Sequence, residues 1–357
     1  MTLAYLGWNP RVAGAFDALA DATLTPARIA REDKDRYLLL GEFGERSAVL
    51  AGRLRHTLST RSERPAVGDW VAARLAQDGD GTIAAVLPRA SAFVRKAAGE
   101  AAEEQVVAAN VDTVFVVAGL DGDWNPRRIE RYLVAAWDSG AVPVVVLNKA
   151  DLLGDAAARV AEMEAVAIGA AVVALSALGG FGLEALDPWL APGATVALIG
   201  SSGVGKSTLV NALAGEDRQA TQAVREADSR GRHTTTWREL VPLPGGALLV
   251  DTPGMRELQL WDEGGDGLDG AFPDVANLAA ACRFGDCAHE AEPGCAVRAA
   301  LASGALEGAR FESWRKLQRE LRWLATRRDA RARAEEASRW KAITRSMKHH
   351  PKADRWR

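Results

Sequence analysis

Hydrophobic and polar positions alternate differently in different parts of the chain, and the first part reads as short strands. Turns rich in Gly, Pro, Asp and Ser separate these runs. The runs cover residues 36–40, 47–51, 69–75 and 82–87. The sequence DGDG at 78–81 can supply the positive φ angles of a hairpin turn. This pattern predicts a small β-barrel or sandwich. A five-stranded barrel of the oligonucleotide-binding (OB) type would fit the length.

From about residue 105 to residue 255, apolar runs of strand length alternate with amphipathic helical segments. The expected strands cover residues 113–118, 142–147, 171–175, 195–199 and 247–250. The expected helices include residues 126–139, 155–168 and 206–213. Such alternation is typical of an α/β fold with a parallel sheet covered on both faces. The apolar runs are far shorter than the roughly 20 residues that cross a bilayer, so we expect no membrane partner.

Beyond residue 260 the pattern changes again. Residues 261–270 are rich in Gly and acidic side chains and are expected to form a linker. The stretch from residue 307 to about 339 is rich in Ala, Arg and Glu with little Gly or Pro, which predicts helix. These changes divide the chain into three domains, residues 1–98, 99–260 and 261–357. Three domains are compatible with a length of 357 residues.

The charge is unevenly distributed along the chain. The formal net charge is -3, yet residues 315–357 carry 15 Lys and Arg against 5 Asp and Glu, a balance of +10. A basic C-terminus favours a polyanionic partner such as nucleic acid, because Lys and Arg release counterions from phosphates. A solvated helix face or a basic tail without a partner is the alternative explanation.

A phosphate-binding loop is the strongest local signal. Residues 200–207 read GSSGVGKS, directly after an expected strand and directly before an expected helix. In this motif the glycines let backbone amides surround phosphate oxygens, Lys206 reaches the β and γ phosphates, and the Ser207 hydroxyl can bind Mg²⁺. The expected phosphate-binding residues are Gly200, Ser201, Ser202, Gly203, Val204, Gly205, Lys206, Ser207 and Thr208.

The sequence NKAD at 148–151 indicates which base is bound. Asn148, Lys149 and Asp151 follow an expected strand at the sheet edge where open α/β folds bind ligands. A carboxylate at Asp151 pairs with the two adjacent N–H donors of guanine, which adenine lacks. Ser176 and Ala177 follow the next expected strand, where they would lie behind the base. GTP or GDP is therefore the expected nucleotide.

Two further segments are expected to bind magnesium and the γ-phosphate. The sequence GRHTTT at 231–236 supplies a threonine that closes over Mg²⁺, and we favour Thr235 over Thr234. The sequence DTPG at 251–254 supplies Asp251, which holds Mg²⁺ through water, and Gly254, whose amide contacts the γ-phosphate. The expected magnesium residues are Ser207, Thr235 and Asp251.

The residue after DTPG is Met255, which cannot orient a water molecule by hydrogen bonds. Intrinsic hydrolysis is therefore expected to be slow. His233 is the best candidate to position water or act as a general base, although it could also be an RNA-facing or solvated loop histidine. The expected catalytic residues are His233, Thr235 and Lys206.

All three cysteines lie within fourteen positions and form a pattern with one histidine. Cys282, Cys287, His289 and Cys295 are spaced C-x4-C-x-H-x5-C. Three thiolates and one imidazole predict a closed, structural zinc site. Unliganded buried cysteines are the alternative. An odd cysteine count argues against a disulfide framework and favours a reducing cytoplasm.

The order of the nucleotide motifs is unusual. GTPases ordinarily begin with the phosphate loop, whereas here NKAD and the Ser176-Ala177 pair precede it. The order indicates a circularly permuted GTPase domain, which a compact domain with adjacent ends can accept. The segment after DTPG then leads into the cysteine-containing domain, so γ-phosphate-dependent movement can be transmitted there.

With its barrel, permuted motifs, Cys3His pattern and basic C-terminus, the whole chain resembles the ribosome small subunit-dependent GTPase A family. The resemblance implies a GTPase with Mg²⁺ and one structural Zn²⁺. It further implies stimulation by the small ribosomal subunit, a late role in the assembly of that subunit and contacts with ribosomal RNA. We expect a monomer in the cytoplasm. A nucleotide-gated RNA-binding switch, in which hydrolysis is secondary, is the alternative function, and an ATP-dependent nucleic-acid enzyme is disfavoured by NKAD.

Overall fold

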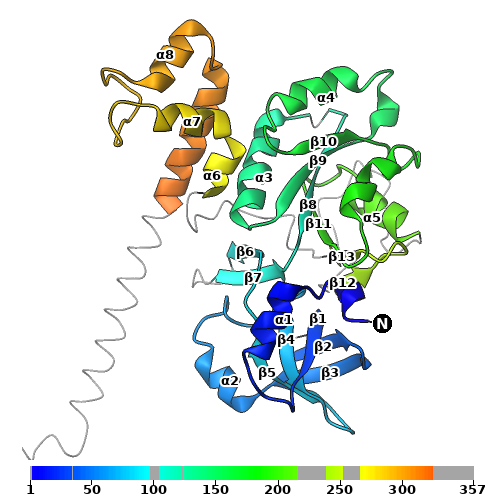
Figure 1. Ribbon diagram of the computed structural model, residues 1–357. Coiled ribbons are helices and arrows are strands. Elements are labelled where there is room, and N and C mark those ends of the chain that lie inside the picture. The colour runs from blue at the N-terminus through cyan, green and yellow to red at the C-terminus, as the bar shows by residue number, and fades with distance from the viewer. Residues whose placement is uncertain are drawn as a thin grey trace, which may run out of the picture.

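The structure is a computed structural model (Figure 1). The structure describes residues 2–33, 35–96, 104–122, 124–215, 239–251 and 266–324. The expected residues His233, Thr234, Thr235 and Gly254 lie outside these ranges, as does the basic segment after residue 324. Among the described helices, none combines the length and the hydrophobicity needed to cross a membrane.

The N-terminal domain is a closed barrel of five strands, as the sequence predicted. Its strands are β1 (Thr25–Asp33), β2 (Arg36–Gly41), β3 (Gly44–Leu50), β4 (Trp70–Arg74) and β5 (Gly81–Val86). Strand β1 pairs with both β2 and β4, and β2 pairs with β3. Strand β5 closes the barrel by pairing in parallel with β3 and antiparallel with β4. Apolar side chains, among them Ile29, Leu39 and Ile83, fill the interior. They come from alternate positions along their strands, because successive side chains of a strand point to opposite faces.

Short helices flank this barrel. They are a 3-10 turn at Ala4–Leu6, α1 (Pro10–Asp17) and α2 (Gly52–Thr57). Helix α1 begins where the Asn9 side chain accepts a hydrogen bond from the Val12 N–H, and Pro10 occupies the first helical position. A hairpin of β6 (Ala92–Lys96) and β7 (Glu104–Ala109) then leads from the barrel to the central domain.

The central domain is a mainly parallel sheet with helices on both faces. Its strands are β8 (Thr113–Gly119), β9 (Val142–Asn148), β10 (Ala171–Ala174), β11 (Thr195–Ile199), β12 (Glu239–Pro242) and β13 (Leu248–Asp251). They are ordered β10-β9-β8-β11-β13-β12, and only β12 is antiparallel to its neighbour β13. Val114 and Phe115 belong to hydrophobic clusters on opposite faces of β8, which explains why this strand reads as a continuous apolar run.

Helices α3 (Pro126–Asp138), α4 (Ala157–Glu164) and α5 (Lys206–Ala214) cover this sheet (Figure 1). A single 3-10 turn covers Ala150–Leu152, and a longer 3-10 helix covers Leu183–Trp189. Strand β12 also pairs with β1 of the barrel, at Glu239 and Arg31, so the barrel and the central domain share one 11-stranded sheet. The two domains are thereby joined by backbone hydrogen bonds.

The C-terminal domain is helical, as expected. It contains α6 (Asp266–Ala271), α7 (Pro273–Ala280), α8 (Ala296–Ser303) and a last helix over residues 308–324. It lies beside α3 (Figure 1). The expectation of a linker over residues 261–270 is wrong from Asp266 onward. Gly267 and Gly270 there pack against the side chains of Asp138 and Trp137 on α3, and that close approach outweighs the low helix propensity of glycine.

Candidate functional site

The predicted nucleotide motifs meet at one edge of the central sheet. Strands β8, β9, β11 and β13 run parallel, so their carboxyl ends lie at the same edge. NKAD begins at the end of β9, the phosphate loop follows β11, and Asp251 ends β13. The strand order reverses between β8 and β11, and open α/β sheets bind ligands at such a point.

The phosphate loop has a left-handed backbone at three glycines, and two of these leave no room for a Cβ. Gly200 has φ +143°, and a Cβ there would lie 2.2 Å from the carbonyl oxygen of Val117. Gly205 has φ +94°, and a Cβ there would lie 2.2 Å from Nδ2 of Asn148. Both glycines therefore allow the loop to approach neighbouring strands closely, with Gly203 at φ +84° between them.

Lys206, Ser207 and Thr208 form the first turn of α5, directly after the loop. The ammonium group of Lys206 lies over the loop, where Nζ donates hydrogen bonds to the carbonyl oxygens of Gly200, at 2.7 Å, and of Ser201. The N–H groups of a helix start and a buried ammonium together favour an anion. Phosphate oxygens are therefore the natural ligands of this turn.

Asn148 connects the phosphate loop to the loop after β10. Its Nδ2 donates to the carbonyl oxygen of Val204 at 2.9 Å, and its Oδ1 accepts the N–H of Ala177 at 2.9 Å. The side chain is almost fully buried, so both hydrogen bonds are protected from water. Asn148 therefore sets the distance between two loops. Val204 and Ala177, its partners in these loops, lie 56 and 29 residues after it in the sequence.

Lys149 has a left-handed backbone, with φ 66°. Its ammonium donates to the carbonyl oxygen of Gly203 at 2.7 Å and forms an ion pair with Asp121 at 2.5 Å. Asp121 was not among the residues predicted from the sequence. Its position two residues after the end of β8, at the same sheet edge as NKAD, was the available signal.

Asp151 and Ser176 face each other across the expected base-binding region. The Ser176 hydroxyl donates to Oδ1 of Asp151 at 2.5 Å, and its oxygen accepts the N–H of Gly179 at 2.9 Å. Ser176 is fully buried. These bonds orient one oxygen of the Asp151 carboxylate, and an oriented carboxylate can accept two parallel N–H bonds from a planar ring.

A second residue that the sequence analysis missed contacts the phosphate loop. Arg128, in the first turn of α3, donates from Nη1 to the Ser201 hydroxyl at 2.7 Å. Helix α3 begins with Asn125 as its cap and Pro126 as its first residue. This helix start was predictable, but the contact between residues 73 positions apart was not.

The four predicted zinc ligands meet in the C-terminal domain. Their donor atoms all lie within 4.8 Å of one another. Nδ1 of His289 is 3.6 Å from Sγ of Cys282 and 3.4 Å from Sγ of Cys295, and the two sulfurs are 3.8 Å apart. Tetrahedral zinc bonds predict about 3.5 Å between nitrogen and sulfur and about 3.8 Å between sulfurs. The donor set thus fits one zinc ion.

The surroundings of the cluster hold its ligands in place. Burial lowers the pKa of His289, which favours the neutral imidazole that a metal requires. The ring packs against Phe311 and Trp314 of the last helix, with ring centroids 6.2 and 5.8 Å away. Cys295 also caps α8 by accepting the N–H of Arg298 at 3.4 Å. A metal bound here would therefore connect the cysteine loop to two helices.

Comparison with known proteins gives consistent matches. The family model described as RsgA GTPase matches residues 86–261. A protein named small ribosomal subunit biogenesis GTPase RsgA, from Opitutus terrae, is 53% identical, and the alignment covers 100% of both chains. A protein of the same name from Syntrophotalea carbinolica is 45% identical over 100% of this chain and 98% of its own.

Solved structures also resemble this fold. YjeQ from Thermotoga maritima is 28% identical, with a TM-score of 0.65 over 84% of this chain and 98% of its own. YloQ, described as a circularly permuted GTPase, is 23% identical, with a TM-score of 0.63 over 84% of this chain and 96% of its own. The permuted arrangement expected from the motif order is thus confirmed as the fold.

Proposed function

This chain belongs to the RsgA GTPase family of GTP-hydrolysing enzymes, and we propose that it hydrolyses GTP in the site just described while bound to the small ribosomal subunit. The partner is inferred from the names of its relatives, which are described as small ribosomal subunit biogenesis GTPases. In this proposal the protein acts late in subunit assembly, as a monomer, in the cytoplasm where ribosomes are found.

The observation that carries the nucleotide assignment is the double hydrogen bond of Asn148 to Val204 and Ala177. It joins the loop that would hold phosphates to the loop that would back the base. The Asp151 carboxylate, oriented by Ser176, then accepts the two N–H groups of guanine. An adenine in the same place would leave that carboxylate unpaired, at a cost of about 1–3 kcal/mol or more.

We assign the phosphates to residues 200–208 and magnesium to Ser207 and Asp251, with Thr235 as the third magnesium residue. Bound magnesium would neutralise charge that develops on the β and γ phosphate oxygens. Lys206 supports this assignment, because its ammonium already lies against the loop carbonyls of Gly200 and Ser201. Thr234, Thr235 and Gly254 remain proposals from the sequence, since they lie outside the described residues.

His233 is proposed to position the attacking water. The proposal rests on the sequence, because Met255 stands where many GTPases carry a water-orienting glutamine. Slow turnover in the absence of a partner is the direct consequence. Cys282, Cys287, His289 and Cys295 are proposed to hold one structural zinc ion, which supplies no open position for chemistry.

The decisive experiment measures GTP turnover with and without purified small ribosomal subunits. We expect slow turnover alone and a large increase with subunits, and equal rates would refute the proposed function. ATP at the same concentration as labelled GTP should displace little of it, because of the Asp151 carboxylate. Effective displacement would point to an ATP-dependent enzyme instead.

A variant separates catalysis from simple nucleotide-gated binding. His233→Ala should lower the subunit-stimulated rate while the protein still binds GTP, because the substitution removes only the water-positioning group. His56→Ala, which changes an exposed histidine of α2, is the matched control. Unchanged turnover of the His233 variant on the subunit would remove this residue from the catalytic set and favour the switch function.

A further inference from the structure

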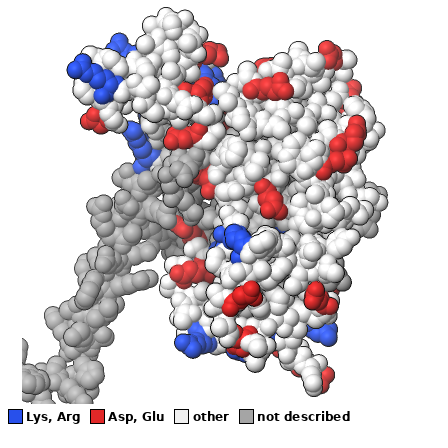
Figure 2. Space-filling model, viewed as in Figure 1, with Lys and Arg blue, Asp and Glu red and all other residues white. Residues whose placement is uncertain are grey.

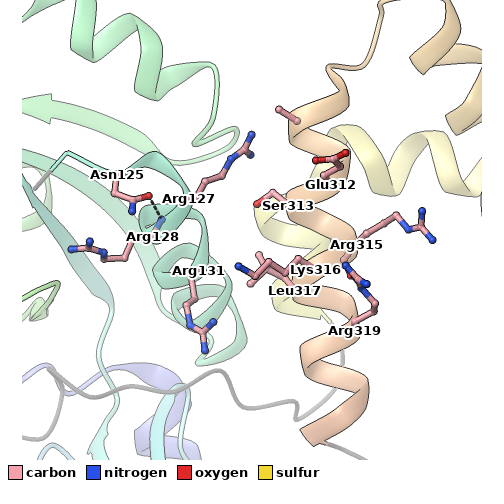
Figure 3. Close-up of a pocket in the computed structure, with 11 residues that line it drawn as sticks. Asn125, Arg127, Arg128, Arg131, Glu312, Ser313, Arg315, Lys316, Leu317 and Arg319 are labelled. Carbon is pink, nitrogen blue, oxygen red and sulfur yellow. Dashed lines mark hydrogen bonds between the residues drawn. The ribbon is translucent and has the colours of Figure 1, made fainter.

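A basic cleft lies between the central domain and the C-terminal domain. Its volume is about 690 Å³, and its walls are α3 and the last helix, residues 308–324 (Figure 3). Six cationic side chains line it, three from each wall, against the single carboxylate of Glu312. They are Arg127, Arg128 and Arg131 on α3, and Arg315, Lys316 and Arg319 on the last helix.

The two walls are fixed relative to each other by a buried arginine. Arg310 on the last helix forms an ion pair with Glu130 of α3 at 3.0 Å and with Asp274 of α7 at 3.0 Å. Arg310 and Glu130 are both buried, so these pairs are shielded from solvent and salt. The Ser313 hydroxyl also donates to Glu130. The two walls of the cleft are therefore held at a fixed position relative to each other.

Some of the cations keep hydrogen-bonding capacity beyond their ion pairs. Arg131 is the most engaged, because both of its Nη groups donate to the Glu320 carboxylate. Arg127 uses Nη1 to bind Glu130, at 3.1 Å, and Arg315 uses Nη2 to bind Glu290, at 2.8 Å. A guanidinium has five N–H donors, so each of these two can also bind an anion. Lys316 extends from the last helix toward α3 (Figure 3). Several anionic groups at successive positions would satisfy such a row of donors.

We propose that this cleft binds the sugar-phosphate backbone of an RNA strand. The inference rests on the proposed function, since a small ribosomal subunit would supply the RNA. An RNA strand presents regularly spaced phosphates, each of which Arg binds with two parallel hydrogen bonds. An acidic peptide fits less well, because peptides need apolar pockets for anchoring side chains and only Ala309 and Leu317 are apolar in the lining.

The position of the cleft suggests how RNA and nucleotide can influence each other. Arg128 is among the cleft-lining residues, but its guanidinium points away from the last helix (Figure 3) and donates to the Ser201 hydroxyl of the phosphate loop at 2.7 Å. RNA bound along the first turn of α3 would thus lie against a residue whose side chain contacts the nucleotide site. Coupling of this kind is reciprocal, so bound nucleotide should also change the affinity for RNA.

The lining of the cleft is basic, whereas the visible surface around it carries charges of both signs (Figure 2). On the face shown in Figure 2, acidic side chains are scattered over all three parts of the molecule, and basic ones lie on the C-terminal domain, near the centre and on the barrel. Outside the cleft, arginines such as Arg36 and Arg159 pair with the carboxylates of Asp80 and Glu162. Three of the six cleft cations, Arg127, Arg131 and Arg315, also pair with carboxylates. The cleft differs in that its lining holds six cations and one carboxylate.

The test compares RNA binding by two charge-matched variants of the full chain. Lys316→Gln with Arg319→Gln removes two charges from the cleft, and Arg46→Gln with Arg159→Gln removes two charges elsewhere. The probe is an RNA hairpin of arbitrary sequence, titrated at several KCl concentrations. Each lost phosphate contact should reduce the slope of log Kd against log salt by about 1. We expect the cleft variant to lose a slope of about 2 and the control to keep the wild-type slope.

A cleft variant that keeps the wild-type slope and binds RNA within twofold of wild type would overturn the proposal. Tighter cleft-dependent binding of a poly-glutamate peptide than of RNA would overturn the assignment to nucleic acid. Both results are separable from the proposed function, which is judged by subunit-stimulated GTP turnover of the wild-type protein. The thermal midpoints of both variants show whether either substitution has unfolded the chain.

Discussion

The buried guanidinium of Arg28, on β1 of the barrel, donates from Nη2 to the main-chain carbonyl of Asn110 at 3.0 Å, just before β8 of the central domain. It also donates to the carbonyl oxygens of Gly68, at 3.1 Å, and of Leu6. Burial lowers the pKa of Arg28 to about 10. One cation thus satisfies three backbone acceptors at the junction of the two domains.

Arg28→Met should destabilise this junction, because the three carbonyls would stay buried without the donor. Such losses cost roughly 3–5 kcal/mol in the free energy of unfolding. Urea unfolding followed by tryptophan fluorescence is a suitable measurement, since Trp70 lies 5.5 Å from the guanidinium. Arg36→Met, on the exposed start of β2, is the control and should change stability little. Equal stability of the two variants would show that Arg28 does not support the junction.

The Asp151 carboxylate predicts a change of base preference. Guanine offers two adjacent N–H donors, whereas xanthine offers one N–H donor beside a carbonyl acceptor. Asp151→Asn replaces a pure acceptor by an amide that both donates and accepts, so it should weaken GTP binding by about 100-fold and strengthen XTP binding. Competition of labelled GTP by XTP measures both effects. Retained GTP preference would mean that Asp151 does not read the base.

Gly205 predicts a strict requirement in the phosphate loop. Gly205→Ala would need φ near +94° and would place Cβ 2.2 Å from Nδ2 of Asn148, so the loop must move away. GTP binding should fall below detection while the barrel and the zinc domain stay folded. Gly14→Ala in α1, where a Cβ meets nothing within 4 Å, is the control and should bind GTP like wild type. Normal binding by the Gly205 variant would contradict the role of this close contact.

The sequence predicted the elements whose patterns are local. Apolar runs located β8, β9 and β11 to within a residue or two, because strands buried on both faces are continuous in hydrophobicity. The phosphate loop and the cysteine pattern were recognisable because their chemistry fixes residue spacing. Strand β1 was missed, since its sequence, TPARIARED, mixes charges with apolar residues and the Arg28 side chain is buried rather than solvated.

Long-range contacts of charged side chains could not be predicted. Asp121 meets Lys149 across 28 positions, Arg128 meets Ser201 across 73, and Arg310 meets Glu130 across 180. Each pair depends on how separate elements pack. From the sequence alone, a charged residue is predicted to lie on the surface. The basic cleft belongs to this class, because it exists only once α3 and the last helix are placed side by side.

A carboxylate in the barrel predicts a specific acid dependence. Hydrogen bonds from Thr23 lower the pKa of Asp21 below its ordinary value of 3.8, and Arg74 lowers it further. The carboxylate therefore contributes stability above pH 3.8, and this contribution is lost as the pH falls through the lower folded value. Asp21→Asn should be less stable than wild type at pH 7, and the difference should shrink below pH 3.8.

Asp78→Asn, which removes an exposed carboxylate from the loop before β5, is the control for this pH series. Its stability relative to wild type should vary little over the same range. Thermal midpoints of the three proteins at closely spaced pH values provide the measurement. An Asp21 difference that stays constant down to pH 3 would contradict the role assigned to the hydrogen bonds from Thr23.

Zinc removal should destabilise the C-terminal domain and loosen the last helix. The four ligands hold the loop at residues 282–295, and His289 packs on Phe311 and Trp314 of that helix. We expect about one zinc per chain, and a chelator should lower the melting temperature, because closed Cys/His sites contribute folding energy directly. Cys287→Ser should lose zinc and melt like the chelated wild type. If the purified protein contains no zinc and a chelator does not change its melting temperature, the metal site is refuted.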